Sequence, residues 1–375
     1  MFPSDVKAVD EDILSFIERG VDHRDDEGFN RLAIRSFALQ YKYIPLYRRY
    51  CQRRGVTPGN IASWKDVPPV FTDVFKAVRL TLLPSLTVKT FMTSGTVNPD
   101  QKGRVDYDMG GLALMKATIS HAASGLLFPD RIKSRLFVIA PSPDIAPNMV
   151  MVFGMNRLKD SFGLQGSRFF IGKNGFDADA LADALRSSEE DNIPATICGG
   201  SFGFINFFDF LRANRLKFRL PKGSRCLDAG GIKGKSRDVV REEFLDYCGE
   251  FLGVSREFCV NLIGMTETAS QYYDNNLKNR GLGVDNLPAK FIPPWTRVLV
   301  VNPDTLEPLP IGETGLLRYF DLANRGHICA IQTDDLGRII DGGFEVSGRA
   351  GEGDVRGCSL TIEEMSRMTD IMEGI

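Results

Sequence analysis

The sequence predicts an α/β fold with a substantially parallel sheet. Short runs rich in β-branched and apolar residues recur between about residues 86 and 285, and each is followed by a turn and a stretch with helical spacing. That alternation is typical of strand–helix–strand units with parallel strands. The chain has 375 residues, more than one hydrophobic core usually serves, so two or more packed subdomains are expected.

Residues 1–85 are expected to form a helical leader that packs on the core. Phe29, Leu32 and Phe37 recur at helical spacing. Pro45 interrupts that pattern because proline lacks the backbone N–H that a helix interior needs. Further prolines, the last at position 84, close the segment.

Residues 86–285 are expected to form the α/β core. The expected strands are 88–92, 135–140, 193–198, 225–227 and 258–263. Residues 286–347 change character, because Gly, Pro and Asp turns separate short apolar runs there, and a smaller β-rich subdomain is expected. Its expected strands are 295–301, 314–319, 327–332 and 337–344. The closing segment, 348–375, carries a candidate amphipathic helix at 360–372.

Composition excludes several classes of function. Forty-six basic and 48 acidic side chains leave a net charge of −2, so no general field for nucleic acid or an anionic membrane is expected. The N-terminus lacks the pattern of a secretory signal, and no stretch reaches the roughly 18 apolar residues of a spanning helix. We therefore expect a cytoplasmic protein with neither nucleic acid nor membrane as partner.

The cysteines predict neither a disulfide framework nor a zinc site. There are seven, widely scattered, and no two form a CxxC pair. A reducing cytoplasm fits this usage. Most of them are expected to act as small buried apolar residues.

The strongest local signal for chemistry is the stretch Thr93-Ser94-Gly95-Thr96, directly after the expected strand 88–92. Hydroxyl side chains and backbone N–H groups at the end of a strand can converge on an anion. The chain contains no Walker loop. Four such residues also occur often in ordinary turns, so the loop alone does not establish a phosphate site.

Further stretches follow this loop in an order that resembles the adenylate-forming superfamily, which comprises acyl-CoA synthetases, peptide-synthetase adenylation domains and luciferases. They are similar, in turn, to that family's phosphate loop, adenine-contacting turn, YGxTE motif, TGDLG motif and hinge. The matching stretches are Thr93-Ser94-Gly95-Thr96, Gly230-Gly231, Asn261-Leu262-Ile263-Gly264-Met265-Thr266-Glu267, Gln332-Thr333-Asp334-Asp335-Leu336-Gly337 and Gly348-Arg349. The order is more specific than any single piece.

The resemblance implies an adenylate-forming large domain that uses ATP and Mg²⁺ to convert a carboxylic acid to an acyl-adenylate, with release of pyrophosphate. Thr266 would hydrogen-bond the α-phosphate, and Glu267 would hold Mg²⁺, which prefers hard oxygen ligands. Asp335 would accept from the ribose hydroxyls, and Arg349 would donate beside it. Gly230-Gly231 and Gly264 would lie against the nucleotide. Departures from the family pattern include Asp334 and the loop residues 97–99.

The chain resembles in particular the acyl-protein synthetase of bacterial luminescence and short relatives from antibiotic pathways such as phenazine assembly. It ends 18 residues after Gly357, so the family's C-terminal lid and its late lysine are expected to be essentially absent, with 348–375 as hinge and remnant. This branch implies transfer of the acyl group to a partner reductase or acyl-carrying protein, and Cys358 is the candidate thiol that accepts it. The acid itself, fatty or planar aromatic, stays open.

A competing pattern is G-x-S-x-G at residues 199–203, the signature of a hydrolase nucleophile elbow. A thioesterase or acyltransferase built on Ser201 would need a downstream histidine, and His327 is the sole candidate. In the adenylate-forming interpretation, the same turn lines the acyl pocket, with Ser201, Phe202, Gly203 and Phe204 as its residues. A catalytically silent adenylate-fold binding protein is the third alternative.

Overall fold

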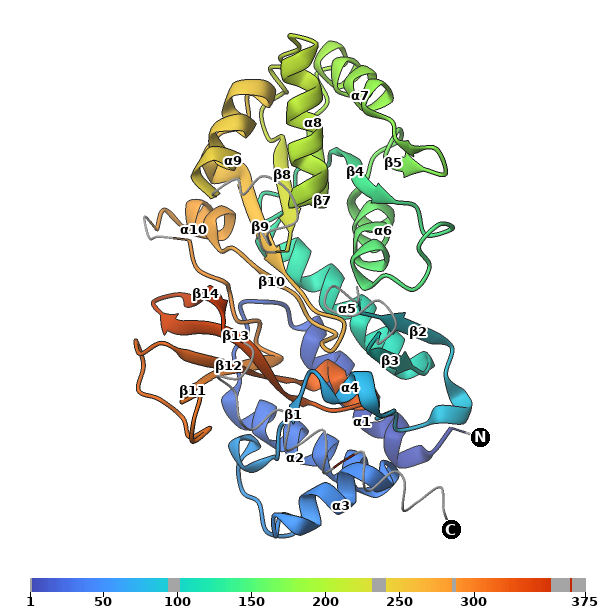
Figure 1. Ribbon diagram of the computed structural model, residues 1–375, viewed down its shortest axis with the longest axis vertical. Helices are drawn as coiled ribbons and strands as arrows, with labels where there is room; N and C mark the ends of the chain where they lie inside the picture. The colour runs from blue at the N-terminus through green and yellow to red at the C-terminus, as the bar shows by residue number, and fades with distance from the viewer. Residues whose placement is uncertain (1, 94–101, 231–240, 285–287, 352–364, 366–375) are drawn as a thin grey trace. The chain divides into compact units, whose positions relative to one another are not determined.

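The computed structural model describes residues 2–93, 102–230, 241–284, 288–351 and 365, and Figure 1 shows their helices and strands. The chain divides into two compact units. Unit 1 comprises the described parts of Met1–His121, Met265–Ser270 and Phe291–Ile375, and unit 2 comprises those of Ala122–Gly264 and Gln271–Lys290. The leader and the C-terminal β-rich segment thus share one unit, although they lie at opposite ends of the sequence.

The leader in unit 1 is helical, as the spacing of its apolar residues predicts. Its helices are α1 (Ser4–Glu18), α2 (Asp26–Tyr43) and α3 (Pro45–Arg53), with a 3₁₀ turn η1 (Trp64–Asp66) after them. Asp25 caps α2 by accepting from the N–H of Gly28 at 2.8 Å. Pro45 ends the first pattern and begins α3, because a missing N–H has no cost in the first turn of a helix.

A five-stranded sheet forms the β-rich part of unit 1. Its order is β1-β13-β12-β11, with β14 paired to β13. The strands are β1 (Val70–Phe71), β11 (Thr296–Val301), β12 (Gly315–Asp321), β13 (Ala330–Ile340) and β14 (Gly343–Arg349). All pairs are antiparallel except β1 with β13.

The expected strand boundaries at 327–332 and 337–344 are wrong. Residues 332–337, expected as a turn, lie inside the single long strand β13, and the turn comes later, before Gly343. Gly337 explains the error, because a Cβ there would lie 2.1 Å from the carbonyl oxygen of Glu345 on β14. This glycine permits close approach of two strands at a bulge and does not make a turn.

The remaining elements of unit 1 are one long helix, α5, and several short segments. They are α4 (Val74–Ala77), η2 (Pro84–Leu86), the hairpin β2 (Lys89–Met92) with β3 (Arg104–Tyr107), most of α5 (Met109–Leu126) and the 3₁₀ segment η5 (Leu322–Gly326). Arg325 in η5 is fully buried and donates to both carboxylate oxygens of Asp108, at 2.8 and 2.9 Å, and to Asp10 in α1. This ion cluster fixes η5 between the start of α5 and the leader.

Unit 2 confirms the predicted parallel sheet. Its seven strands have the order β10-β9-β8-β7-β4-β5-β6, and the five inner ones run parallel. The strands are β4 (Arg135–Pro141), β5 (Arg168–Gly172), β6 (Gly175–Phe176), β7 (Ala195–Gly200), β8 (Arg225–Ala229), β9 (Cys259–Ile263) and β10 (Tyr272–Tyr273).

Helices α6 (Val150–Phe162), α7 (Ala178–Glu190), α8 (Ser201–Ala213), α9 (Arg241–Tyr247) and α10 (Asn276–Leu282) accompany this sheet, as Figure 1 shows. A π-helix, η3 (Cys248–Leu252), and a 3₁₀ turn, η4 (Arg256–Phe258), follow α9. The core of the unit is rich in phenylalanine, with Phe204, Phe207 and Phe208 of α8 fully buried. Within the described ranges, every helix is too short or too polar to cross a bilayer.

Candidate active site

Unit 1 carries five of the residues that the sequence singles out, and they lie on four different segments of the chain. Thr266 and Glu267 lie in the segment Met265–Ser270, Thr93 follows β2, Asp335 lies on β13 and Arg349 ends β14. Thr266 and Glu267 are almost fully buried.

The carboxylate of Glu267 is buried and has no side-chain partner among the described residues; its own backbone N–H donates to it. Burial raises its pKa to about 7, Lys76 and Arg349 act in the opposite direction, and Asp73 adds to the increase. Its backbone, in contrast, is firmly held: its carbonyl accepts from Nδ2 of Asn324 at 2.9 Å and lies 3.2 Å from Nε2 of His327. An unshared, fixed carboxylate of this kind fits a hard cation such as Mg²⁺.

Asp321 and Asn324 hold the rest of the segment Met265–Ser270 by hydrogen bonds. Asp321 accepts from the N–H and the hydroxyl of Ser270, at 2.8 and 2.9 Å, and Oδ1 of Asn324 accepts from the N–H of Ala269 at 2.8 Å. Burial raises the pKa of Asp321 to about 6. Sequence analysis missed both residues; the sole signal was the helix-capping pattern by which Asp321 opens η5, and that pattern does not indicate a site.

His327 contacts the backbone of the same segment. It is fully buried, and burial lowers its pKa to about 4, so its ring is neutral at physiological pH. Its Nε2 lies against the carbonyl of Glu267, and Tyr107 and Phe75 pack on the ring at centroid distances of 5.3 and 6.1 Å. A neutral imidazole that donates to this carbonyl would position the backbone of Glu267.

Asp335 and Arg349 lie directly opposite one another on β13 and β14. Nε of Arg349 donates to Oδ1 of Asp335 at 2.9 Å, and Asp334 lies farther from the guanidinium, at 3.7 Å. The ion pair orients the carboxylate of Asp335 and leaves its second oxygen for another donor.

Thr93 closes the β2–β3 hairpin. Its N–H donates to the carbonyl of Gly103 at 2.9 Å, and its hydroxyl accepts from the N–H of Gly103 at 2.8 Å. Arg104, beyond this closure, pairs with the buried carboxylate of Asp106, so its charge is engaged within the hairpin. Ser94, Gly95, Thr96, Gly231, Cys358 and the expected helix 360–372 (Met365 apart) lie outside the described residues.

Unit 2 carries the expected adenine turn at the end of β8. Gly230 has a φ of +104°, a conformation that favours glycine, and its N–H donates to the carbonyl of Leu262 at 2.8 Å. A Cβ at this position would meet nothing within 4 Å, so one face of the backbone is open among the described atoms. Gly264 follows β9, and a Cβ there would have Gln271 as its nearest neighbour at 3.7 Å.

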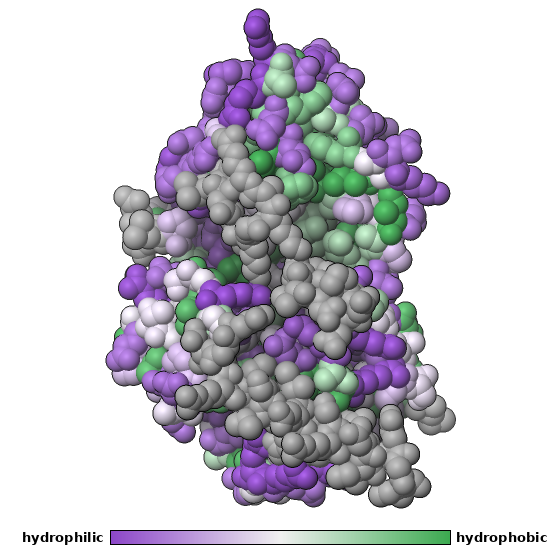
Figure 2. All heavy atoms as spheres, viewed as in Figure 1, coloured by the Kyte–Doolittle hydropathy of each residue, from purple (hydrophilic) through white to green (hydrophobic). Residues whose placement is uncertain are grey.

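The expected acyl-pocket residues divide between surface and core. Phe202 is 58% exposed, whereas Phe204 is fully buried and packs against Phe244 at a centroid distance of 5.2 Å. The side chain of Phe204 therefore belongs to the core of unit 2. Ile145 and Met149 are also exposed in this unit, and Figure 2 shows apolar surface near α6.

Packing explains the G-x-S-x-G pattern. A Cβ on Gly199 would lie 3.0 Å from Ile139 on β4, and a Cβ on Gly203 would lie 2.8 Å from the same side chain. Gly199 on β7 and Gly203 on α8 therefore let both elements lie close to Ile139 on β4. The buried hydroxyl of Ser201 has no hydrogen-bond partner in the described part of the chain.

Solved structures of adenylate-forming enzymes share this fold. The chain aligns with an open conformation of 2-hydroxyisobutyryl-CoA ligase in complex with 2-HIB-AMP and CoA, with a TM-score of 0.63 and 14% identity over 85% of this chain and 69% of that one. It also aligns with ATP-bound MatB from Rhodopseudomonas palustris, with a TM-score of 0.50 and 15% identity over 70% of this chain and 48% of that one.

Curated relatives give a narrower likeness. The long-chain-fatty-acid–luciferin-component ligase of Vibrio harveyi is 23% identical over 89% of this chain and 82% of its own length. The protein of the same name from Aliivibrio fischeri is 21% identical over 83% of this chain and 79% of its own length. Residues 9–366 match the family described as "Acyl-protein synthetase, LuxE". Because that match covers nearly the whole chain, this protein belongs to the LuxE acyl-protein synthetase family.

Proposed function

We propose that this protein activates a carboxylic acid with ATP. A carboxylate oxygen of the acid attacks the α-phosphorus, a new P–O bond forms, and the bond between the α- and β-phosphates breaks, so that an acyl-adenylate and pyrophosphate result. Family membership and the shared fold support this reaction. The relatives named above are ligases of long-chain fatty acids, and a fatty acid is accordingly the first substrate class to test.

The observation that carries the proposal is the buried carboxylate of Glu267, which has no side-chain partner among the described residues and lies in the field of Lys76 and Arg349. Such a group is costly to keep ionised unless a cation shares it. A Mg²⁺ ion held there would neutralise the phosphate oxygens on which charge develops. Asn324 and His327 would then act as positioning residues, because both hold the backbone carbonyl of Glu267.

We assign the other residues as follows. Thr266 donates its hydroxyl to the α-phosphate, and Thr93 with Ser94, Gly95 and Thr96 binds the outer phosphates. Asp335, oriented by Arg349, accepts from the ribose hydroxyls. In unit 2, Gly230 with Gly231 and Gly264 offers bare backbone to the purine, while the exposed side chain of Phe202 faces the acyl group.

The second half-reaction is proposed to use a thiol. A thiolate attacks the acyl carbon of the adenylate, a thioester forms and AMP leaves. Cys358 is the candidate acceptor before transfer to a partner reductase. Incubation with ATP, Mg²⁺ and a labelled acid should leave a label on the protein that neutral hydroxylamine removes. The same label on Cys358→Ser would rule this acceptor out and leave the adenylation step untouched.

Pyrophosphate exchange tests the first half-reaction. The full chain is incubated with ATP, Mg²⁺, labelled pyrophosphate and a panel of fatty and aromatic acids. We expect acid-dependent exchange in the wild type and a loss of about 100-fold in Glu267→Gln. Glu313→Gln, which changes an exposed loop glutamate, is the matched control and should retain exchange. Equal exchange in all three proteins would show that Glu267 does not hold the metal.

A further inference from the structure

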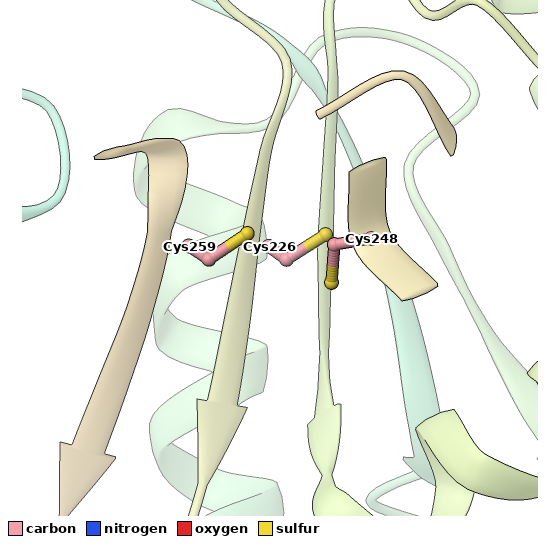
Figure 3. A group of neighbouring side chains, drawn as sticks. All are labelled: Cys226, Cys248 and Cys259. Atoms are coloured by element: carbon pink, nitrogen blue, oxygen red, sulfur yellow. The ribbon is translucent and has the colours of Figure 1, made fainter. Parts of the chain in front are cut away.

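Three cysteines that are far apart in the sequence meet in the core of unit 2. Cys226 lies on β8, Cys248 begins the π-helix η3, and Cys259 begins β9. Their sulfur atoms all lie within 4.8 Å of one another, and each residue is at most 2% exposed. Figure 3 shows the three side chains together between the two strands and η3.

The backbone of β8, β9 and η3 places the three cysteine side chains together. Cys226 and Cys259 are direct partners in the register of the parallel pair β8–β9, so their side chains emerge side by side on one face of the sheet. Cys248 comes from the widened turn of η3, whose end is fixed by the left-handed Gly253. Such π turns are rare and are frequently found at functional sites.

The spacing of the sulfurs suits one metal ion. At a metal–sulfur bond of about 2.3 Å, three sulfurs placed symmetrically around an ion lie about 4 Å apart. The observed limit of 4.8 Å requires only small movements of the side chains to reach that geometry. The thiol of Cys259 otherwise has a long contact with the carbonyl of Ser255, at 3.7 Å, so metal binding would break no strong hydrogen bond there.

A partly buried cation lies next to the cluster. Arg241 donates from its guanidinium to the carbonyl of Cys259 at 3.2 Å and pairs with Asp228, two residues beyond Cys226 on β8. Three thiolates around a mono- or divalent ion leave a negative complex, and a guanidinium in this position offsets part of that charge.

We propose that Cys226, Cys248 and Cys259 form a thiolate site for one soft, closed-shell metal ion of the class of Zn²⁺ and Cu⁺. Each sulfur exchanges its proton for a bond to the ion, so three protons are released and neither metal nor sulfur changes oxidation state. The bound ion would tie η3 to β8 and β9. The site is separate from the proposed Mg²⁺ at Glu267, because Mg²⁺ prefers oxygen ligands.

The test uses the full chain in reducing buffer without chelator and Cd²⁺ as probe, because cadmium thiolates absorb ultraviolet light by sulfur-to-metal charge transfer. We expect an absorption that saturates at one Cd²⁺ per chain with the intensity of three thiolates. Excess Zn²⁺ or Cu⁺ should remove it, and excess Mg²⁺ should not. Wild-type protein without a saturable signal would overturn the proposal.

Two variants test whether Cd²⁺ binding depends on the three clustered cysteines or on buried cysteines in general. Cys248→Ala should no longer saturate at one Cd²⁺ per chain, and it should bind Cd²⁺ at least tenfold more weakly. Cys198→Ala removes an equally buried cysteine from β7, outside the cluster, and should still saturate at one Cd²⁺ per chain. Circular dichroism checks folding, and Cys259→Ser, which preserves side-chain size, replaces Cys248→Ala if that variant does not fold. Saturation at one Cd²⁺ per chain with wild-type affinity in a folded cluster variant would contradict the proposed site.

Discussion

Arg349 and Asp335 face each other across β13 and β14, and Nε of Arg349 donates to Oδ1 of Asp335 at 2.9 Å. The same strand pair repeats the arrangement, because Nε of Arg338 on β13 donates to Glu345 on β14 at 2.6 Å. One hairpin thus carries two cross-strand ion pairs, of which we assign one to the nucleotide and the other to the surface.

The first prediction compares these two pairs. Arg349→Ala should raise the KM for ATP about tenfold, because the carboxylate of Asp335 loses the hydrogen bond that orients it. Stability should change little, since the Arg349 side chain is 47% exposed. Arg338→Ala is the control and should leave the KM for ATP unchanged. An equal effect of both substitutions in steady-state kinetics would assign Arg349 to the hairpin and not to the nucleotide.

The second prediction concerns pH. Burial raises the pKa of Glu267 to about 7, so its carboxyl is mostly protonated at pH 5.5 and ionised at pH 8. The apparent Mg²⁺ affinity in the exchange assay should therefore rise about tenfold per pH unit below pH 7 and level off above it. His327 stays neutral in this range because burial lowers its pKa to about 4. A flat pH profile of Mg²⁺ affinity would contradict this assignment.

The third prediction is that Glu267→Gln stabilises the protein in the absence of metal. A carboxyl whose pKa is raised in the folded state binds its proton more tightly there, so its ionisation destabilises the fold as pH rises above the unfolded value of 4.5. At pH 8 the gain in free energy of unfolding should approach about 3 kcal/mol, and near pH 4 it should vanish. Urea unfolding at both pH values measures it, with Glu313→Gln as control. Equal stability of wild type and Glu267→Gln at pH 8 would show that the buried charge is already compensated.

The fourth prediction separates packing from catalysis at residues 199–203. Gly203→Ala should destabilise the protein by about 1–3 kcal/mol, because the added methyl group would lie 2.8 Å from Ile139. Gly154→Ala, at a glycine of α6 with nothing within 4 Å, should be neutral or slightly stabilising. Thermal unfolding compares the two variants.

Ser201→Ala completes that comparison. It should retain pyrophosphate exchange, and a fluorophosphonate probe should not label the wild-type serine. Labelling of Ser201, with loss of activity in the alanine variant, would favour the hydrolase alternative.

The sequence predicts four of the five parallel strands of unit 2, because each of these is a short apolar run followed by a turn. The fifth, β5, was not predicted. The sequence also predicted a turn at residues 332–337 where the structure has a strand. A glycine serves left-handed turns and close strand contacts equally well, and sequence alone does not distinguish these at Gly337. Residues 332–349 were therefore divided at the wrong place.

The residues of the candidate site could be predicted where they share one short motif. The residues that hold the motif in place could not, because they lie far from it in the sequence. Thr266 and Glu267 belong to one short motif, whereas Asn324 reaches Glu267, and Asp321 reaches Ser270 of the same segment, from more than fifty residues away. The cysteine cluster was missed for the same reason. Spacing between positions 226, 248 and 259 shows no metal motif, because the register of β8 against β9 brings two of the thiols together.

We expect this chain to form an acyl-adenylate with the help of Glu267. Mass spectrometry of the reaction with ATP, Mg²⁺ and a long-chain fatty acid detects this intermediate itself. Acyl-AMP should form in wild type and Glu313→Gln, and almost none should form in Glu267→Gln. Absence of acyl-AMP from the wild type with every fatty and aromatic acid of the panel, or undiminished acyl-AMP in Glu267→Gln, would contradict this expectation.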